Sequence, residues 1–239
     1  MSSVQVITPG LFTTVQDLGR KGWQRFGVPV AGVFDSLAAQ VANWLVGNRN
    51  GDALLEITYS GPTLTTDTPL QVAITGGQLT ATLAGQPVPL WQSFVWQPGQ
   101  ELCLGGLTAG ARAYLAVQGG WQVPVVLGSR STYVRAAIGG LEGRQLKAGD
   151  QLPVQAGDVS APRRSLPRAF WPKLGGEITL RFVPGPQTDY FAPDALEQLC
   201  ANTYRISQSS DRMGIRLEGS AIVPIEPDII SDAIAFGSI

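Results

Sequence analysis

Short runs of β-forming residues, each closed by turn residues, constrain the fold of this chain more than any other feature. The runs are rich in Val, Ile, Leu, Thr, Tyr and Phe, and Gly, Pro, Asn or Asp separates most of them. They are VQVI (4–7), LFTTV (11–15), LLEITY (54–59), LQVAIT (70–75), LTATL (79–83), SFVW (93–96), ELCL (101–104) and RAYLAV (112–117). Many short strands with tight turns are typical of barrels and sandwiches. The sequence therefore predicts a mainly β fold, a β-barrel with a few helices as α+β elements.

Two helices are expected to interrupt these strands. The first begins near Asp35-Ser36, whose side chains can accept hydrogen bonds from first-turn amides, and ends at Gly47. Its apolar positions share one face of a 3.6-residue period: Leu37, Val41, Trp44 and Leu45. The second begins at Pro193-Asp194, because proline suits the first helical position. Its apolar face would carry Leu196, Leu199 and Cys200. Both helices are expected to support a sheet.

The chain is long enough to form one large domain or two small ones. A proline-containing stretch without periodicity, residues 155–176, is typical of a connection. After it, EITLRFVPG (177–185) returns to strand character. The predicted organisation is a first lobe at 1–154, a connection at 155–176 and a short second lobe at 177–239.

The chain contains no histidine. This excludes Ser-His-Asp and Cys-His catalysis within the chain and removes the commonest metal ligand. Cys103 and Cys200 are far apart in apolar surroundings, which favours two buried thiols in a reducing cytosol over a disulfide. No metal site is therefore expected. Proton transfer would fall to carboxylates, Lys, Tyr, a bound substrate or another subunit.

Charge is sparse and balanced along the chain. The net charge is −1, only 15% of residues are charged, and no block of like charges occurs. We therefore expect no nucleic acid and no membrane as a partner. The N-terminus lacks the features of a secretory signal, and no apolar run approaches the ~20 residues of a membrane span. A cytoplasmic protein is expected, and its low charge density suits a surface that is buried against a partner.

A series of ordered motifs carries a resemblance to a known family. The motifs are TTVQDLGR (13–20), GVP (27–29), GVFD (32–35), LVGN (45–48), LEIT (55–58), TGG (75–77), YLAVQGG (114–120), LGSRST (127–132), GGLEGRQLKAGD (139–150), VPGPQ (183–187) and SSDRMGIRLEG (209–219). In order and spacing they resemble the allophanate hydrolase subunit 2 family. This group includes the C subunit of 5-oxoprolinase, the antagonist KipA and the carboxyltransferase part of urea carboxylase.

The resemblance implies a fold, partners and an activity. The fold would be two cyclophilin-like lobes with a cleft between them. The partners would be a sister subunit of similar fold (the B-type subunit) and an A-type subunit of the LamB/YcsF type. The activity would be ATP-dependent hydrolysis of 5-oxo-L-proline to L-glutamate, with ATP bound across the assembled complex.

Two other functions fit the same resemblance. One is a carboxyltransferase that moves a carboxyl group from carboxybiotin to urea or a related amide, the only case in which biotin takes part. The other is a non-catalytic antagonist of a sensor-kinase inhibitor protein. SDAIAFGSI (231–239) resembles a motif beyond which members of this family continue with further strands. An incomplete second lobe, and a chain that is inactive alone, are therefore expected.

Candidate substrate-binding residues lie first in the TTVQDLGR motif. Gln16, Asp17 and Arg20 directly follow a strand, and Arg20 could bind a carboxylate, carbamate or phosphate through two hydrogen bonds. The alternative is a buried Asp–Arg pair that fixes the turn permitted by Gly19.

Three further polar candidates surround the first helix. Asp35 could orient an amide or ureido nitrogen or act as a base, or it could simply cap the helix. Glu56 alternates with apolar neighbours, so it is expected to face solvent or a cleft. Asn48 could bind substrate or belong to the turn that ends the helix.

The remaining candidates lie in loop-like motifs. Gly139, Gly140 and Arg144 are the predicted cofactor-binding residues, because the two glycine amides could form an anion-binding nest that Arg144 completes. The alternative is that the glycines form turns between strands. Further substrate-binding candidates are Ser129, Arg130, Ser131, Ser209 and Arg212. Without a histidine to act as base, neither Ser209 nor its neighbour is assigned as a nucleophile, and the catalytic residues stay unassigned.

Overall fold

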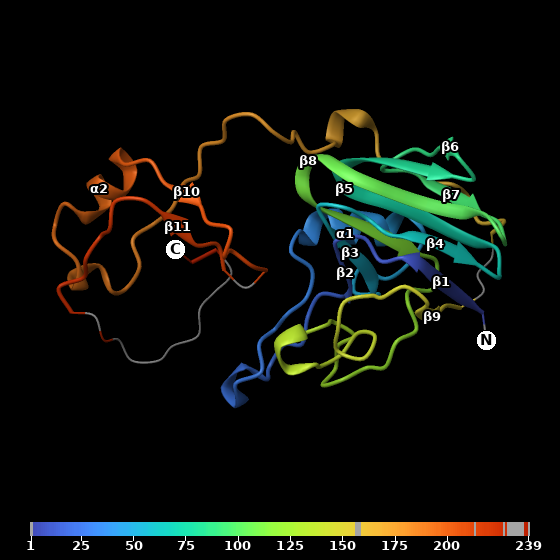
Figure 1. The fold of residues 1–239 in the computed structure, drawn as a ribbon, viewed down its shortest axis with the longest axis horizontal. Coiled ribbons are helices and arrows are strands. Elements are labelled where there is room, and N and C mark those ends of the chain that lie inside the picture. The colour runs from blue at the N-terminus through green and yellow to red at the C-terminus, as the bar shows by residue number, and fades with distance from the viewer. Residues whose placement is uncertain (1, 156–158, 213, 227, 229–236, 239) are drawn as a thin grey trace. The chain divides into compact units, whose positions relative to one another are not determined.

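The computed structural model describes residues 2–155, 159–212, 214–226, 228 and 237–238. Contacts divide the chain into two compact units, Met1–Glu177 and Ile178–Ile239, both of which are shown in Figure 1. Within the described residues, no helix is long and apolar enough to cross a membrane. The lobe boundaries at 154 and 177 stay predictions.

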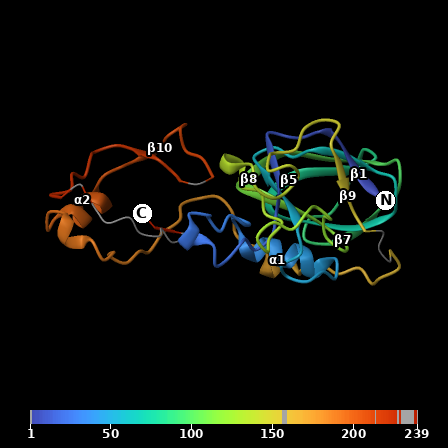
Figure 2. The same ribbon diagram turned by 90° about the horizontal axis from the view of Figure 1, so that it is seen from below.

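The first unit is built on one curled sheet of nine strands. They are β1 (Ser3–Thr8), β2 (Phe12–Gln16), β3 (Leu54–Thr58), β4 (Thr63–Thr66), β5 (Leu70–Leu83), β6 (Gln86–Pro87), β7 (Ser93–Trp96), β8 (Glu101–Val117) and β9 (Gln151–Pro153). The order is β2-β3-β8-β4-β1-β9, and β5 pairs with β6, β7 and β8. Figure 2 shows the strands curving around a common interior, a half-barrel. The predicted mainly β fold with a few helices is confirmed.

Strand β8 produces much of this curl, because both of its edges are paired. One edge pairs with β5 along most of its length, and the other pairs with β4 near its start and with β3 near its end. Gly76 in β5 has a φ of 90° at a shift in register, where a bulge bends the strand. A Cβ at this position would lie 2.7 Å from the Arg112 carbonyl oxygen. The runs 70–75 and 79–83, expected as separate strands, therefore form one bent strand.

Helix α1 (Ser36–Leu45) begins where the sequence predicts. The Asp35 carboxylate accepts a hydrogen bond from the Ala38 amide at 3.0 Å, and Gly47 adopts a φ of 78° just beyond the helix. The buried side, however, differs from the expected one. It consists of small residues and one leucine: Ala38, Ala39, Ala42, Asn43 and Leu45. Leu37 and Trp44 are 69% and 46% exposed, so only Leu45 of the expected face is fully buried. Close packing of α1 on β5 and β8 explains the preference for alanine.

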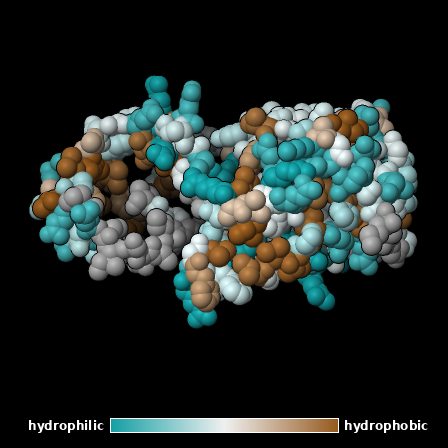
Figure 3. Space-filling view, turned by 60° about the horizontal axis from the view of Figure 1, so that its bottom comes forward, coloured by the Kyte–Doolittle hydropathy of each residue, from teal (hydrophilic) through white to brown (hydrophobic). Residues whose placement is uncertain are grey.

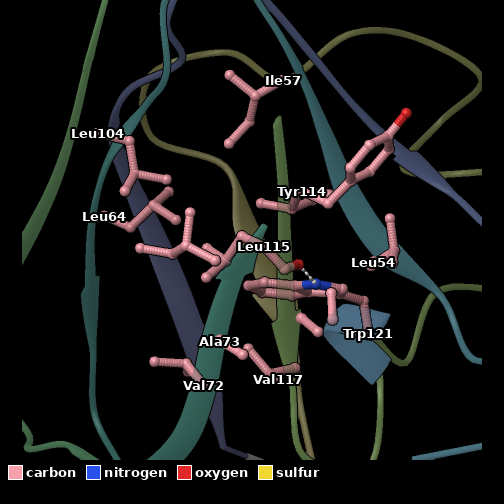
Figure 4. Close-up of a cluster of buried hydrophobic side chains, with 14 of the residues drawn as sticks. Leu54, Ile57, Leu64, Val72, Ala73, Leu104, Tyr114, Leu115, Val117 and Trp121 are labelled. Carbon is pink, nitrogen blue, oxygen red and sulfur yellow. Dashed lines mark hydrogen bonds between the residues drawn. The ribbon is translucent and has the colours of Figure 1, made fainter. Parts of the chain in front are cut away.

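The core of the first unit lies between the curled sheet and α1, and Figure 4 shows part of it. Leu54, Ile57 and Leu115 from neighbouring strands are fully or almost fully buried. Trp121 follows β8 and donates its indole N–H to the Leu115 carbonyl at 3.3 Å. Burying one such aliphatic side chain stabilises the fold by roughly 1.5–3 kcal/mol. The sheet is therefore a rigid base for the loops at its ends.

Part of the predicted connection packs on this unit. The Ser93 amide donates to the Arg164 carbonyl at 2.9 Å, and the Leu166 amide donates to the Trp91 carbonyl at 2.9 Å. The Trp91 and Trp171 rings lie 6.0 Å apart. The described residues here include one short helix, η3 (Arg168–Phe170). This stretch is thus fixed to the sheet over its middle part, although it has no periodic pattern.

The second unit has little regular structure in its described residues. It contains η4 (Thr188–Tyr190), α2 (Ala195–Ala201), β10 (Arg205–Ile206) and β11 (Leu217–Glu218). Helix α2 follows Asp194, as predicted. The strand predicted at 177–185 is wrong, because Ile178 and Leu180 are 76% and 79% exposed and no described strand pairs with this segment. An open hollow of about 1500 Å³ lies within the unit, beside Phe182, Leu196 and Leu199.

Both cysteines are free thiols. Cys103 on β8 is half-buried, whereas Cys200 on α2 is exposed. The prediction of two thiols is therefore confirmed, and the prediction that both are buried is wrong, because Cys103 is only half-buried and Cys200 is exposed.

Candidate functional site

The Asp17 carboxylate joins two distant segments of the first unit. It accepts hydrogen bonds from the Gly19 amide (2.8 Å), the Ser129 hydroxyl (2.6 Å), the Arg130 amide (2.6 Å) and the Ser131 hydroxyl (2.5 Å). Charge-assisted hydrogen bonds of this kind are among the strongest in proteins. Asp17 therefore fixes the loop 127–132 to the end of β2, and Ser129 and Ser131 serve that structural contact.

Arg20 lies beneath the same loop. Its side chain is 1% exposed, and Nη2 donates to the Ser131 carbonyl. Among the described residues, Nε and Nη1 have no hydrogen-bond partner. Burial lowers the pKa of Arg20, and the Asp17 carboxylate opposes that shift. The guanidinium is thus enclosed, and a substrate would reach it only if the loop moved.

Two more predicted residues contribute to tight packing at strand ends. The Gln16 amide nitrogen donates to the Thr14 hydroxyl (3.0 Å) and the Thr132 carbonyl (3.2 Å). Asn48 donates to the Val117 carbonyl at 2.8 Å and accepts from the Gly119 amide at 2.8 Å. Asn48 thereby links the turn after α1 to the end of β8.

In the glycine loop 139–144, three backbone amides and the Arg144 side chain donate hydrogen bonds within the chain. The Gly140 amide donates to the Arg130 carbonyl at 3.0 Å. Arg144 binds both oxygens of Asp150, at 2.7 and 2.9 Å, and also binds Glu142. Hydrogen bonding to Asp150 raises the pKa of Arg144 and lowers that of Asp150. This arrangement does not fit a cradle for the phosphates of ATP, so ATP binding by this chain stays a prediction.

A second polar cluster forms where β3 and β8 pair beside the start of α1. Glu56 lies directly opposite Tyr114 in the register and is 1% exposed. Its carboxylate accepts hydrogen bonds from the Phe34 amide at 2.6 Å and the Tyr114 hydroxyl at 3.2 Å. The Tyr114 hydroxyl accepts from the Asp35 amide at 2.6 Å. The expectation that Glu56 faces solvent is wrong, because the segment that leads into α1 covers it.

Arg112 completes this cluster. It is two residues before Tyr114 on β8, so both side chains point to the same face of the sheet. Its Nε lies 3.9 Å from the Glu56 carboxylate, and its guanidinium lies 5.2 Å from the centre of the Phe34 ring. The side chain is 14% exposed. Nε has no hydrogen-bond partner among the described residues. Nε is itself buried, so only the exposed part of the Arg112 guanidinium can bind an anionic group at the edge of the cluster.

The cluster also holds its phenol in the protonated form. Burial, followed by the Glu56 carboxylate, raises the pKa of Tyr114 above its ordinary range. At neutral pH the site therefore combines a buried carboxylate, a protonated phenol and a guanidinium. This set can bind and orient a polar substrate that carries a carboxylate or an amide.

The predicted residues Ser209 and Arg212 belong to the second unit. The Ser209 hydroxyl lies 3.0 Å from the Ser207 hydroxyl, which donates to Glu218 at 2.5 Å. Ser209 is exposed and Arg212 is half-buried. A substrate-binding role for these two residues stays a prediction.

The structure brings together some predicted residues and adds others. Asp17, Ser129, Arg130 and Ser131 form one network, and the Asp35 and Glu56 segments meet in the other. Tyr114 and Arg112 are not predicted from the sequence. Their alternation in RAYLAV places them on one face, but only the strand register shows that this face meets Glu56. No group of acidic or cysteine side chains among the described residues is arranged to hold a metal ion.

Comparisons with known proteins place this architecture in context. Residues 26–239 match the family described as "Carboxyltransferase domain, subdomain A and B". The chain is 34% identical over 227 residues to urea amidolyase of Saccharomyces cerevisiae, an alignment that covers 91% of the chain and 12% of that protein. It is 37% identical over 220 residues to the C subunit of 5-oxoprolinase from Escherichia coli, covering 92% of the chain and 69% of that protein.

A solved structure shares the fold. The crystal structure of the K. lactis urea amidolyase superposes with a TM-score of 0.84 at 33% identity, covering 94% of this chain and 14% of that one. The chain therefore spans only a small part of the urea amidolyases that it matches.

Proposed function

Because the chain belongs to the family of carboxyltransferase domains with subdomains A and B, we propose that it is a component of an ATP-dependent 5-oxoprolinase. The complex would hydrolyse 5-oxo-L-proline to L-glutamate together with a B-type subunit and an A-type subunit of the LamB/YcsF type. The observation that carries this proposal is the similarity to the C subunit of 5-oxoprolinase, which runs through 69% of that protein. The similarity to urea amidolyase runs through 12%.

The proposed substrate has a carboxylate and a ring amide, and the cluster at β3 and β8 suits both groups. Arg112 would bind the carboxylate with the part of its guanidinium that reaches the surface, while its buried Nε lies beside Glu56 without a hydrogen-bond partner among the described residues. Glu56 and protonated Tyr114 would hold Arg112 and the Phe34–Asp35 backbone in place. ATP, bound elsewhere in the assembly, would supply activation of the amide carbonyl. This chain would thus contribute recognition and orientation of the substrate.

Reconstitution tests the proposal. The chain is mixed with purified A-type and B-type subunits, 5-oxoproline and ATP, and the release of glutamate and phosphate is followed. We expect glutamate only when all subunits and ATP are present. Absence of glutamate above the level seen without this chain would contradict the proposal.

A variant of Arg112 tests the site separately. Arg112→Met removes a charged hydrogen bond worth about 1.5–3 kcal/mol, so kcat/KM for 5-oxoproline should fall by roughly ten- to a hundredfold. Arg112→Lys keeps the positive charge beside Glu56 and shows whether the loss arises from folding. Arg49→Met, at an exposed position, is the matched control and should retain activity. An unchanged kcat/KM in Arg112→Met would remove this residue from the site.

The similarity to urea amidolyase supports a second candidate, carboxyl transfer from carboxybiotin to urea. The test supplies a carboxylated biotin carrier protein and urea, and follows urea-dependent loss of the carboxyl group. Transfer to urea without glutamate formation in the first assay would favour this function over 5-oxoproline hydrolysis.

A further inference from the structure

Residues 21–29, here named the aromatic arm, project from the body of the first unit, as both Figures 1 and 2 show. The base of the arm is fixed by two backbone hydrogen bonds. The Arg20 amide donates to the Val30 carbonyl at 2.8 Å, and the Val33 amide donates to the Asp17 carbonyl at 2.8 Å. The arm therefore starts from the well-bonded segment that contains Asp17.

The tip of the arm is a short, ordered turn that displays aromatic rings. It contains η1 (Gln24–Phe26), closed by a hydrogen bond from the Phe26 amide to the Trp23 carbonyl at 2.9 Å. Trp23 is 36% exposed and Phe26 is 62% exposed, with ring centres 5.8 Å apart. The Arg25 guanidinium lies 4.7 Å from the centre of the Phe26 ring. Aromatic residues and arginine are the residues most enriched at the centre of protein interfaces.

Helix α1, in the same unit, also displays large apolar side chains. Leu37 is 69% exposed and Trp44 is 46% exposed on the outer side of that helix. Figure 3 shows hydrophobic residues, in brown, gathered along the lower edge of the first unit, where the arm and α1 come forward. Exposed apolar surface of this kind marks interaction sites when it is continuous.

Charge indicates what would cover this surface. Between Asp17 and Asp35 the chain contains no acidic residue, and the arm carries Lys21 and Arg25. A second copy whose arm met this arm at a twofold axis would bring the same two cations together, which is unfavourable. Nucleic acid is disfavoured by the net charge of −1 and by the small number of cations on the arm. The surface fits a protein that offers an apolar recess edged by Asp and Glu.

We propose that the aromatic arm is a docking element for the sister subunit of the complex, with Trp23 and Phe26 in an apolar recess and Lys21 and Arg25 against acidic residues at its edge. This inference rests on the proposed function, because it takes the B-type subunit as the partner. The arm is built before binding, so docking would require little ordering of the chain.

The test measures binding of the purified B-type subunit to the full chain by isothermal titration calorimetry. The double variant Trp23→Ser/Phe26→Ser should weaken binding at least about tenfold, as expected for aromatic residues at the centre of an interface. Phe170→Ser is the matched control, since Phe170 is 73% exposed on the first unit but lies outside the arm. It should bind like the wild-type chain.

The charge contribution is tested by rate measurements. Arg25→Glu should slow association with the B-type subunit and flatten its dependence on salt concentration, whereas Arg163→Glu, an exposed control, should not. Far-UV circular dichroism and urea midpoints should be unchanged in all of these variants, because each replaced side chain is exposed.

The outcomes separate this inference from the proposed function. If the wild-type chain binds the B-type subunit and supports glutamate release, but the arm variants bind equally well, only the docking proposal is overturned. If the wild-type chain shows no binding to the B-type subunit, the assembly and the docking proposal fail together. Arm-dependent binding of a single-stranded oligonucleotide, with binding of the B-type subunit unaffected, would also overturn it.

Discussion

At the scale of single residues, several polar side chains that resemble a binding site have structural tasks. Asp17 accepts four hydrogen bonds, two of them from serine hydroxyls more than a hundred residues away in sequence. Asp35 caps α1, and Asn48 connects two strand ends. In this chain, a motif that is both polar and rich in glycine therefore supplies hydrogen-bond partners for the backbone and side chains of a tight loop.

Asp17→Asn tests the structural task of Asp17. An amide in place of the carboxylate would direct an N–H group at the Arg130 amide if its oxygen keeps the other three contacts. We expect a loss of about 2–4 kcal/mol in the free energy of unfolding, measured with urea. Asp189→Asn, at an exposed position, is the matched control. A loss below about 0.5 kcal/mol, the range of ordinary surface changes, would contradict this role.

The Arg144–Asp150 pair predicts a dependence of stability on pH. Hydrogen bonds from Arg144 lower the pKa of Asp150 below its ordinary 3.8 in the folded state. The pair therefore stabilises the fold fully above that ordinary value, and the contribution is lost as pH falls through the lower folded pKa. Wild type should be more stable than Asp150→Asn by about 1–2 kcal/mol at pH 7.

The same difference should shrink as the pH falls below about 3.8 and vanish once Asp150 is protonated in both states. Urea unfolding of both proteins between neutral pH and about pH 2 measures it. Glu142→Gln, whose carboxylate is 70% exposed, serves as the comparison and should show a smaller effect. If the difference in the free energy of unfolding stayed constant over this whole pH range, the Arg144–Asp150 ion pair would not be its cause.

The sequence predicts the contacts of a single residue well where its partners are close in sequence. It predicts them poorly where they depend on the register between strands. The cap at Asp35 follows from residues within one turn of α1. The meeting of Glu56 with Tyr114 and Arg112 requires that β3 and β8 pair with one particular alignment across more than fifty residues of chain. Because a shift of one residue would reverse the faces, neither strand alone could identify this cluster.

At the scale of elements, strands and helices were largely predictable, but their extents and buried faces were not. The runs 101–104 and 112–117 are one strand, β8, because Leu107 and Ala109 between them continue the pairing with β5 across shifts in register. Strands β4 and β9 are short and polar and give little signal on their own. Leu37 and Trp44 of the face predicted for α1 are exposed, whereas Val41 and Leu45 pack on the core, so periodicity identified the buried side only in part.

A pair of variants on α1 distinguishes its two faces. Ala42 is fully buried, and Ala42→Leu would force extra volume into the contact of α1 with the sheet. This should cost about 1–3 kcal/mol in the free energy of unfolding. Leu37→Ser, on the exposed side, should change it by less than about 0.5 kcal/mol. The opposite order of effects in urea unfolding would mean that the alanine face is not the packed one.

At the scale of the whole molecule, the two units differ in how much apolar surface they bury. The first unit has a continuous core around β3, β5 and β8, whereas no described residue of 178–226 is fully buried. The mainly β character and the family were evident from motifs spread along the whole chain. The absence of a core among the described residues of the second unit was not evident from the sequence. The segment EITLRFVPG has the composition of a strand, but a strand is buried only when it has partners.

Hydrogen exchange should report this difference directly. Amides in β5 and β8 should be protected to the level of global unfolding, because their hydrogen bonds open only with the core. Amides of 178–206 should exchange faster by several orders of magnitude. Mass spectrometry of peptides from the intact chain measures both. Equal protection in the two units would mean that the second unit is as stable as the first.

The pairing of β1 with β9 has a consequence for how such a unit can be used in larger proteins. Ser3 lies opposite Pro153, so the first and last strands of the sheet are paired neighbours. A sheet whose own first and last strands pair keeps that pairing when it is placed within a longer polypeptide, and residues 159–177, which belong to the same unit, lead the chain onward. This geometry would allow the same half-barrel to serve as a cassette within a long multifunctional chain or as part of a separate subunit.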